Sequence, residues 1–246
     1  MGSISLFPLK IAILLNSFAS PLTPLIRSSF ITAITFASPC SLPPPTIDFF
    51  DPIIAQTYPN PADYDLIVLS GGTADPMGSQ PWVLKMQEFL RSTARDYPQR
   101  KMVGICWGHQ TMCVAFGGVV GNREEGAEIG VTEIELMDEG RKMLEIQDEG
   151  KLQMHEFHRR EIKAPAKGFV ELAEGRQMFM NERKTIWTFQ GHPELNEGLA
   201  KCMLRESSAY MGVDGKEMEK LSKRMERKHD GVRIWKRILE WVAERD

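Results

Sequence analysis

Short apolar runs, each followed by a stretch with helical spacing, constrain the fold of this chain more than any other feature. Most of these runs are rich in Val, Ile and Leu without alternation, so they are typical of strands buried on both faces. The predicted strands are Lys10–Leu15, Thr46–Phe50, Tyr64–Leu69 and Arg100–Ile105, and the predicted helices are Leu22–Phe36, Pro81–Asp96 and Gly108–Phe116. Strands that alternate with helices form a mostly parallel sheet with helices on both faces. The sequence therefore predicts a doubly wound α/β fold.

The second half of the chain has a more antiparallel pattern. Short or alternating runs predict the strands Ile129–Leu136, Gln153–Ile162, Phe169–Leu172 and Thr185–Phe189. From Leu199 onwards the tail is predicted to be helical. Its apolar residues recur at helical spacing and are expected to dock on the main domain; they are Ile234, Trp235, Ile238, Leu239 and Val242. With no internal repeat and no linker, residues 1–246 are predicted to form one domain.

Composition narrows the class of protein and of partner. The 246 residues are 42% hydrophobic and 26% charged with a formal net charge of -3, which is typical of a soluble globular protein. Basic residues are balanced by acidic ones, so we expect no nucleic-acid partner. The basic segment Lys216 to Lys228 is interleaved with Glu, which favours a solvated helix face.

Neither a membrane segment nor a cysteine-based site is expected. The apolar run Leu9 to Leu15 is short, has no basic segment before it and closes at Asn16-Ser17, so it predicts a buried strand rather than a signal peptide. No run approaches the roughly 20 apolar residues of a membrane helix, and we expect a cytoplasmic protein. The four cysteines show no C-x-x-C pair, so neither a zinc site nor a disulfide framework is expected, and Cys113 and Cys202 are predicted to be buried.

The stretch 104-GICWGHQTMC-113 places Cys106 where a predicted strand ends and a helix begins, with Gly104 and Gly108 two residues to either side. A sharp strand-to-helix turn crowds the backbone, so small residues at these positions let the turn form and lift the central side chain out of the sheet. The unpaired N–H groups and the positive dipole at the helix N-terminus favour a thiolate. This setting predicts that Cys106 is a nucleophile.

A base and an orienting carboxylate follow another predicted strand, in the segment 189-FQGHPEL-195. His192 and Glu194 are two residues apart on one side of an extended segment, so the carboxylate can hold and polarise the imidazole, as the third member of a triad does. The loop 69-LSGGTADP-76 also leaves a strand, and its glycines can turn a backbone N–H toward Cys106. One donor from this loop and the N–H of Trp107 would make an oxyanion hole.

Three motifs in one order resemble the class I glutamine amidotransferase family. GICWGHQ is similar to the family's nucleophile elbow, SGG to its oxyanion-loop glycines and GHPE to its His-Pro-Glu segment. The resemblance covers about residues 10–204, and residues 205–246 form a helical C-terminal extension outside it. Together with the strand pattern, it implies a flavodoxin-like fold. We expect no cofactor, and the absence of a G-x-x-x-x-G-K-[ST] loop means that ATP use is not expected.

The resemblance implies a role for each residue of the motifs. Cys106 would attack a γ-glutamyl carboxamide carbon to form a thioester. His192 would transfer the proton, and Glu194 would orient His192. By the motif match, Gly72 and Trp107 would supply the backbone donors to the oxyanion.

The resemblance also implies substrate contacts. Gln110 would contact the glutamyl group, although at the start of a helix it could instead cap the helix or face solvent. His155, or a neighbour in 154-MHEFHR-159, would touch the α-amino or α-carboxylate end of the substrate. His155 and His158 are three apart in a predicted strand and would point to opposite faces, so a shared metal ion is not expected. His109 is expected to pack or hydrogen-bond locally.

Three functions remain open from the sequence. The site could hydrolyse glutamine and pass ammonia to an acceptor; because only about forty helical residues follow the matched region, the acceptor would be a separate synthetase. It could instead hydrolyse γ-glutamyl bonds in a small peptide or conjugate, as the stand-alone γ-glutamyl peptidases of the family do. The family often has Phe at the position of Gly191 in QGHPE, and the stand-alone members are more similar here. A non-catalytic binding subunit is the third alternative, against which the intact triad argues.

Overall fold

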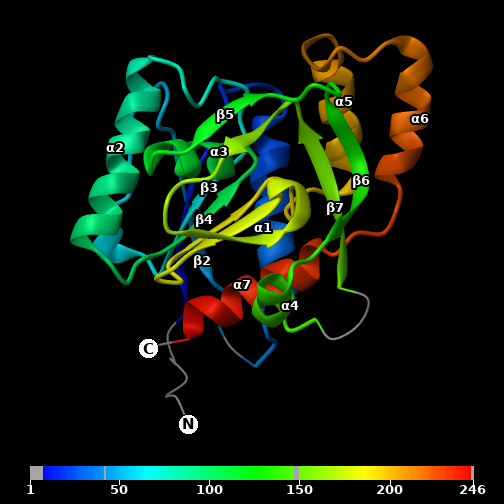
Figure 1. Cartoon of the computed structure of the whole chain (residues 1–246). Helices are drawn as coiled ribbons and strands as arrows, with labels where there is room; N and C mark the ends of the chain where they lie inside the picture. Colours follow the sequence, from blue (N-terminus) through cyan, green and yellow to red (C-terminus); the bar gives the residue numbers. More distant parts are fainter. Residues whose placement is uncertain (1–7, 42, 147–149, 245–246) are drawn as a thin grey trace.

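The structure is built on a seven-stranded sheet with the strand order β2-β1-β3-β4-β11-β10-β9 (Figure 1). It is a computed structural model that describes residues 8–41, 43–146 and 150–244. The ends of the predicted domain, residues 1–7 and 245–246, lie outside the described residues, as do 42 and 147–149. Strands β2, β1, β3, β4 and β11 are parallel, and β10 is antiparallel to both of its neighbours. The parallel part has the order of flavodoxin-like sheets, which confirms the predicted fold.

The elements lie close to the predicted ranges. The strands of the main sheet are β1 (Lys10–Leu14), β2 (Thr46–Phe50), β3 (Leu66–Leu69), β4 (Lys101–Ile105), β9 (Phe169–Ala173), β10 (Met178–Asn181) and β11 (Ile186–Phe189). The helices are α1 (Thr23–Ala37), α2 (Pro81–Asp96), α3 (Trp107–Ala115), α4 (Asp138–Leu144), α5 (Glu197–Met211), α6 (Gly215–Met225) and α7 (Gly231–Ala243), with short 3-10 turns at Pro61–Asp63 and Glu174–Arg176. Within the described part of the chain, no helix has the length and apolar character needed to cross a membrane.

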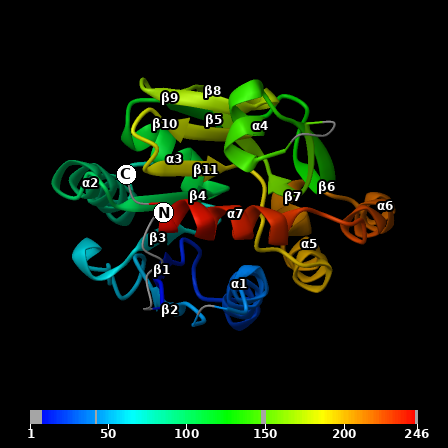
Figure 2. The same ribbon diagram turned by 90° about the horizontal axis from the view of Figure 1, so that it is seen from below.

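Helices cover both faces of the sheet (Figure 2). Helices α1 and α7 lie on one face, and α2 and α3 lie on the other. Side chains of β1 alternate between these layers: Ile11 and Ile13 pack with α1 and α7, whereas Ala12 and Leu14 pack with α2 and α3. All four side chains are fully buried. A strand buried on both faces gains nothing from polar alternation, which explains the continuous apolar run in the sequence.

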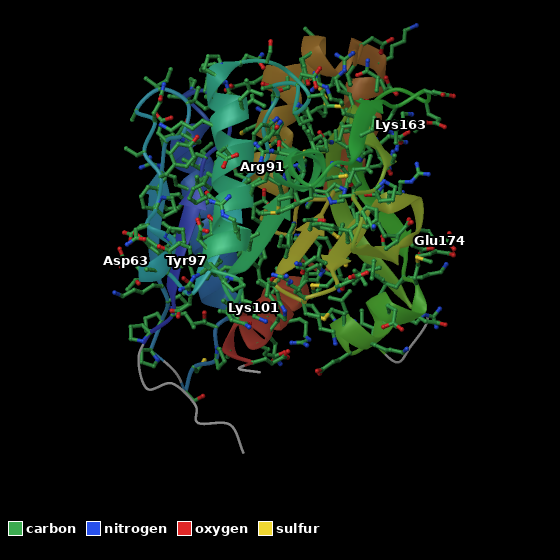
Figure 3. The ribbon with its side chains drawn as sticks, turned by 60° about the vertical axis from the view of Figure 1, so that its left-hand side comes forward. Asp63, Arg91, Tyr97, Lys101, Lys163 and Glu174 are labelled. Carbon is green, nitrogen blue, oxygen red and sulfur yellow. The ribbon has the colours of Figure 1, made fainter. Side chains whose placement is uncertain are left out.

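The helical tail docks on the main domain as predicted. In α7, Ile234, Trp235, Ile238 and Leu239 are buried in the same cluster as α1 and the sheet, and Val242 packs against that cluster. The ring centroids of Phe30 and Trp235 lie 6.2 Å apart. At the other end of α7, the ammonium group of Lys101 lies 4.8 Å from the centroid of the Trp241 ring. Figure 3 labels Lys101 close to this helix. The tail therefore completes one face of the sheet.

The second half departs from prediction at Gln153–Ile162, which is two strands and not one. Strand β7 (Lys151–His158) pairs with β6 (Glu128–Glu135), and β8 (Arg160–Ala164) pairs with β5 (Val119–Asn122). The chain changes partner at Arg159, where the backbone N–H of Arg123 donates to the Arg159 carbonyl. The segment Gln153–Ile162 was predicted from its sequence as one alternating run, whereas residues 154–158 are all buried and β7 ends at His158. Strands β5 and β10 and helix α4 were not predicted.

Candidate active site

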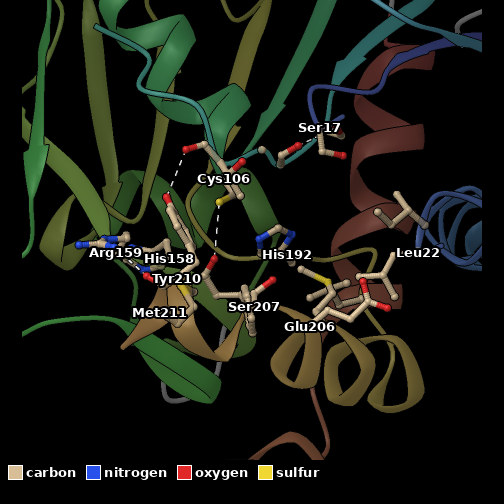
Figure 4. A pocket seen from close by; sticks show the side chains of 18 of the residues that line it. Ser17, Leu22, Cys106, His158, Arg159, His192, Glu206, Ser207, Tyr210 and Met211 are labelled. Carbon is tan, nitrogen blue, oxygen red and sulfur yellow. Dashed lines mark hydrogen bonds between the residues drawn. The ribbon is translucent and has the colours of Figure 1, made fainter. Parts of the chain in front are cut away.

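Four parallel strands end at one edge of the sheet, where the predicted residues Cys106 and His192 lie with the residues that follow β1 and β3. Ser17 follows β1, Gly71 follows β3, Cys106 follows β4 and His192 follows β11. Strand order reverses between β1 and β3, and open α/β sheets bind ligands at the carboxyl ends of strands beside such a reversal. All four residues line one cavity of about 280 Å³. Figure 4 shows Cys106 and His192 near its centre.

The turn at Cys106 has the geometry that its two glycines imply. Cys106 has φ 52° and ψ -103°, a backbone conformation that residues with side chains rarely adopt. A Cβ on Gly104 would lie 2.7 Å from the backbone carbonyl of Gly108, and one on Gly108 would lie 2.5 Å from the carbonyl oxygen of Leu69. Both glycines are therefore needed for α3 to start this close to the sheet. The Cys106 sulfur lies 3.9 Å from the Phe157 carbonyl oxygen.

The imidazole of His192 lies between a carboxylate and the thiol side chain. Its Nδ1 is 2.8 Å from Glu194 Oε1, and its Nε2 has no oxygen or nitrogen hydrogen-bond partner among the described residues. Burial disfavours the charged ring, but the interactions with the Glu194 carboxylate and the Cys106 side chain outweigh it and raise the pKa of His192 well above its usual value. A Cβ on Gly71 would lie 2.8 Å from His192 Cε1 and 3.6 Å from Cys106 Cβ. Gly71 therefore leaves the space in which the two side chains approach each other.

The loop after β3 is held in place from three sides. The Ser70 hydroxyl accepts from the Asn16 backbone N–H at 2.9 Å, the Trp107 indole donates to the Ala74 carbonyl at 3.0 Å, and Arg160 donates to the Thr73 carbonyl at 3.1 Å. Gly72 lines the cavity, and a Cβ there would lie 2.2 Å from the Asn16 carbonyl oxygen. Trp107 directly follows Cys106, with its ring fully buried. The loop and the start of α3 thus meet beside the thiol.

The two residues expected to contact substrate differ in position. Gln110 lines the cavity, and its amide donates to the Arg160 carbonyl and to Gln190 Oε1, both at 2.9 Å. His155 does not belong to the cavity lining; its ring centroid lies 4.6 Å from that of His229, and burial is the main cause that lowers its pKa to about 3. Three other residues of the segment 154–159 do line the cavity: Phe157, His158 and Arg159.

His109 and the other cysteines are also placed. His109 is fully buried and packs locally as predicted, with Nδ1 2.8 Å from the Thr188 hydroxyl and Nε2 3.1 Å from the Arg176 carbonyl. Cys113 is buried, as predicted, whereas Cys202 is only partly buried.

A second histidine, His158, lines the cavity and faces two glutamates, an arrangement that was not predicted. His158 Nδ1 is 2.8 Å from the Arg160 carbonyl, and Nε2 is 3.1 Å from Glu156 and 3.4 Å from Glu128. Burial opposes the charge on this ring, but the two carboxylates raise the pKa of His158 to about 10. A Cβ on Gly191 would lie 2.3 Å from Glu156 Oε1, so Gly191 makes room for the buried carboxylate. In the described part of the chain no three His, Cys, Asp or Glu side chains form a group able to hold a metal ion.

Comparisons with known proteins identify the family of this chain. The model of the family "Glutamine amidotransferase class-I" matches residues 46–208. The chain is 34% identical over 240 residues to the glutamine amidotransferase-like protein chyE of Penicillium rubens, which covers 96% of this chain and 98% of that protein. It is 29% identical over 154 residues to gamma-glutamyl peptidase 2 of Arabidopsis thaliana, covering 59% of this chain and 60% of that one.

A solved structure shares the fold. The crystal structure of a glutamine amidotransferase from Thermotoga maritima superposes with a TM-score of 0.72 at 16% sequence identity, covering 97% of this chain and 100% of that chain. At this identity the likeness concerns the fold, whereas the family model and chyE concern the sequence itself. The chain therefore belongs to the class I glutamine amidotransferase family.

Proposed function

We propose that this protein cleaves a γ-glutamyl amide bond through a thioester on Cys106. The observation that carries the proposal is the position of His192, which lies beside Cys106, holds Glu194 through Nδ1 at 2.8 Å and keeps Nε2 unbonded to any described oxygen or nitrogen. A thiol nucleophile needs a base, and the base needs a group that fixes its tautomer and orientation. Cys106 follows β4, and His192 and Glu194 follow β11, the neighbouring strand, which supports this pairing of nucleophile and base.

The reaction follows from these positions. The Cys106 thiolate attacks the carboxamide carbon, and the N–H groups of Gly72 and Trp107 stabilise the oxyanion that forms. The His192 imidazolium then protonates the departing nitrogen as the C–N bond breaks, leaving a thioester. Neutral His192 next takes a proton from water as that water attacks the thioester carbon. The product acid leaves, and the thiolate and imidazolium are restored. Gln110 contacts the glutamyl group from the floor of the cavity.

The fate of the nitrogen separates two forms of this function. In one, the substrate is glutamine, and ammonia passes to an acceptor or a separate synthetase. In the other, the substrate is a γ-glutamyl conjugate, and the amine is simply released. The similarity to chyE supports the first form, and the similarity to a gamma-glutamyl peptidase supports the second. Thioester chemistry at Cys106 is common to both.

Mass spectrometry of the intact protein tests this chemistry. We expect a diazo-ketone analogue of glutamine to add one adduct to the wild type and none to Cys106→Ala. Cys113→Ala is the matched control, because Cys113 lies on α3, which begins directly after Cys106, and is also buried. Release of glutamate from γ-glutamyl amides is measured in parallel. An adduct that persists in Cys106→Ala, or turnover that survives that substitution, would remove Cys106 as the nucleophile.

A further inference from the structure

The cavity has two chemically different halves on either side of His192. One half, the polar lobe, is lined by Gly72, Thr73, Gln110, Arg159, Arg160 and Tyr210. The other half, the apolar lobe, is lined by Phe18, Leu22, Ile26, Leu195 and Met203. In Figure 4, Arg159, Tyr210 and Met211 lie on one side of His192, and Ser17, Leu22 and Glu206 lie on the other, so each lobe is named for most of its lining and not for all of it. Four residues of the apolar lobe, all except Phe18, belong to one hydrophobic cluster.

In the proposed reaction the leaving amine lies beside His192, and the arginines of the polar lobe direct the glutamyl group away from the apolar lobe. His192 must reach the departing nitrogen to protonate it, so the amine lies on the His192 side of the scissile bond. The glutamyl head group then extends the other way, where Arg159 and Arg160 supply positive charge for its α-carboxylate. Departing ammonia needs about as much room as one water, for which roughly 15 Å³ suffices. The cavity of about 280 Å³ leaves far more space than that.

Phe18 gives the apolar lobe an exposed apolar surface that a ligand can cover. Phe18 lines the cavity and is 58% exposed, so a ligand that covers it removes apolar surface from water. Outside the His192–Glu194 pair, the charged side chain that lines this side of the cavity is acidic, Glu206, whereas the lining arginines belong to the polar lobe. An amine that carried a carboxylate would therefore meet like charge here. A neutral amine with a ring would meet apolar surface.

We propose that the apolar lobe binds the leaving group, and that the preferred substrate is a γ-glutamyl amide of an apolar, ring-bearing amine without a carboxylate. This inference rests on the proposed function, since it assigns the released half of the same substrate. It makes Phe18 and Met203 specificity-determining residues, and it makes Glu206 a residue that discriminates against amino acids and peptides as leaving groups.

Four substrates test the assignment: glutamine, γ-glutamyl methylamide, γ-glutamyl benzylamide and γ-glutamyl-phenylalanine. For the wild type we expect kcat/KM to be at least about tenfold higher for the benzylamide than for the methylamide or for γ-glutamyl-phenylalanine. Phe18→Ala and Met203→Ala should reduce the benzyl-to-methyl ratio to about threefold or less. Glu206→Gln should raise the ratio of γ-glutamyl-phenylalanine to benzylamide turnover several-fold.

Leu25→Ala is the matched control, because Leu25 lies on α1 beside Ile26, is 46% exposed and is not part of the cavity lining. It should leave every ratio unchanged. Equal kcat/KM for the methyl and benzyl amides, with the Cys106 adduct still formed, would overturn the leaving-group assignment and leave the proposed function standing. Absence of both adduct and amide cleavage would overturn the proposed function and the assignment with it.

Discussion

Two buried histidines beside the same cavity each face a glutamate, and they differ in what their second nitrogen meets. His192 bonds to Glu194 through Nδ1 and keeps Nε2 unbonded to any described oxygen or nitrogen. His158 has Nδ1 against the Arg160 carbonyl and Nε2 within ion-pair distance of Glu156 and Glu128. Carboxylates raise the pKa of both rings. A raised pKa alone therefore does not make a histidine able to transfer a proton to substrate, because one of its ring nitrogens must also reach the reacting atoms.

The largest effects are expected from removing the Cys106 thiol or the His192 imidazole. Cys106→Ala and His192→Ala should each lower kcat/KM by at least about 10³-fold, because the two act as one unit. His158→Gln is the matched variant at the second histidine and should lower kcat/KM by less than about tenfold. Steady-state kinetics with the best γ-glutamyl amide measures these effects. A larger loss from His158→Gln than from His192→Ala would reverse the two assignments.

Glu194→Gln should have a smaller effect, about 10²-fold in kcat/KM, because it removes the group that orients His192 and leaves the imidazole itself. The same kinetic assay applies, with thermal unfolding as a check that the fold is kept. If Glu194→Gln is more damaging than His192→Ala, Glu194 does more than orient the ring.

Alanine in place of Gly71 adds a methyl group beside His192, and alanine in place of Gly191 adds one beside Glu156, the partner of His158. The first change should lower activity and the second should lower stability. Gly71→Ala places a Cβ against His192 and should lower kcat about tenfold. Gly191→Ala places a Cβ against Glu156 and should lower the free energy of unfolding by about 1–3 kcal/mol. Gly215→Ala is the control for denaturant unfolding, because nothing lies within 4 Å of its Cβ position. A fully stable Gly191→Ala would show that Glu156 is not confined by this glycine.

A pH dependence of stability is also expected from His158. With a folded pKa of about 10 and a usual value of 6.5, the folded state keeps a proton that the unfolded state has lost between these values. Stability from this group is therefore fully present below about pH 6.5 and is lost toward pH 10, by up to about 1.4 kcal/mol per pH unit. Urea unfolding should show the free energy of wild type falling relative to His158→Gln across this range. Parallel curves would contradict a charged His158.

Local patterns in the sequence predicted the first half of the fold and the centre of the site. A strand buried on both faces has a continuous apolar run, and a nucleophile elbow needs its two glycines, so these features are visible in neighbouring residues. Strand ends in a parallel sheet share one edge, which is why Cys106 and His192 could be expected together although 86 positions separate them.

Features that depend on distant partners could not be predicted in the same way. The break at Arg159 exists because β7 and β8 pair with different strands. The segment MHEFHR was singled out, but which of its histidines faces the cavity depends on that pairing, and His158 rather than His155 lines it. Phe18 and Met203 reach the cavity only through the packing of a loop and α5, and nothing in their local sequence marks them.

The backbone at Cys106 has a consequence for how the protein withstands heat. A φ of 52° at a residue with a side chain costs about 1–3 kcal/mol, and glycine largely avoids this cost. Cys106→Gly should therefore melt at a higher temperature than Cys106→Ala, although glycine usually weakens a fold by its freedom in the unfolded chain. At residue 106, thermal stability favours glycine, whereas the proposed chemistry requires cysteine.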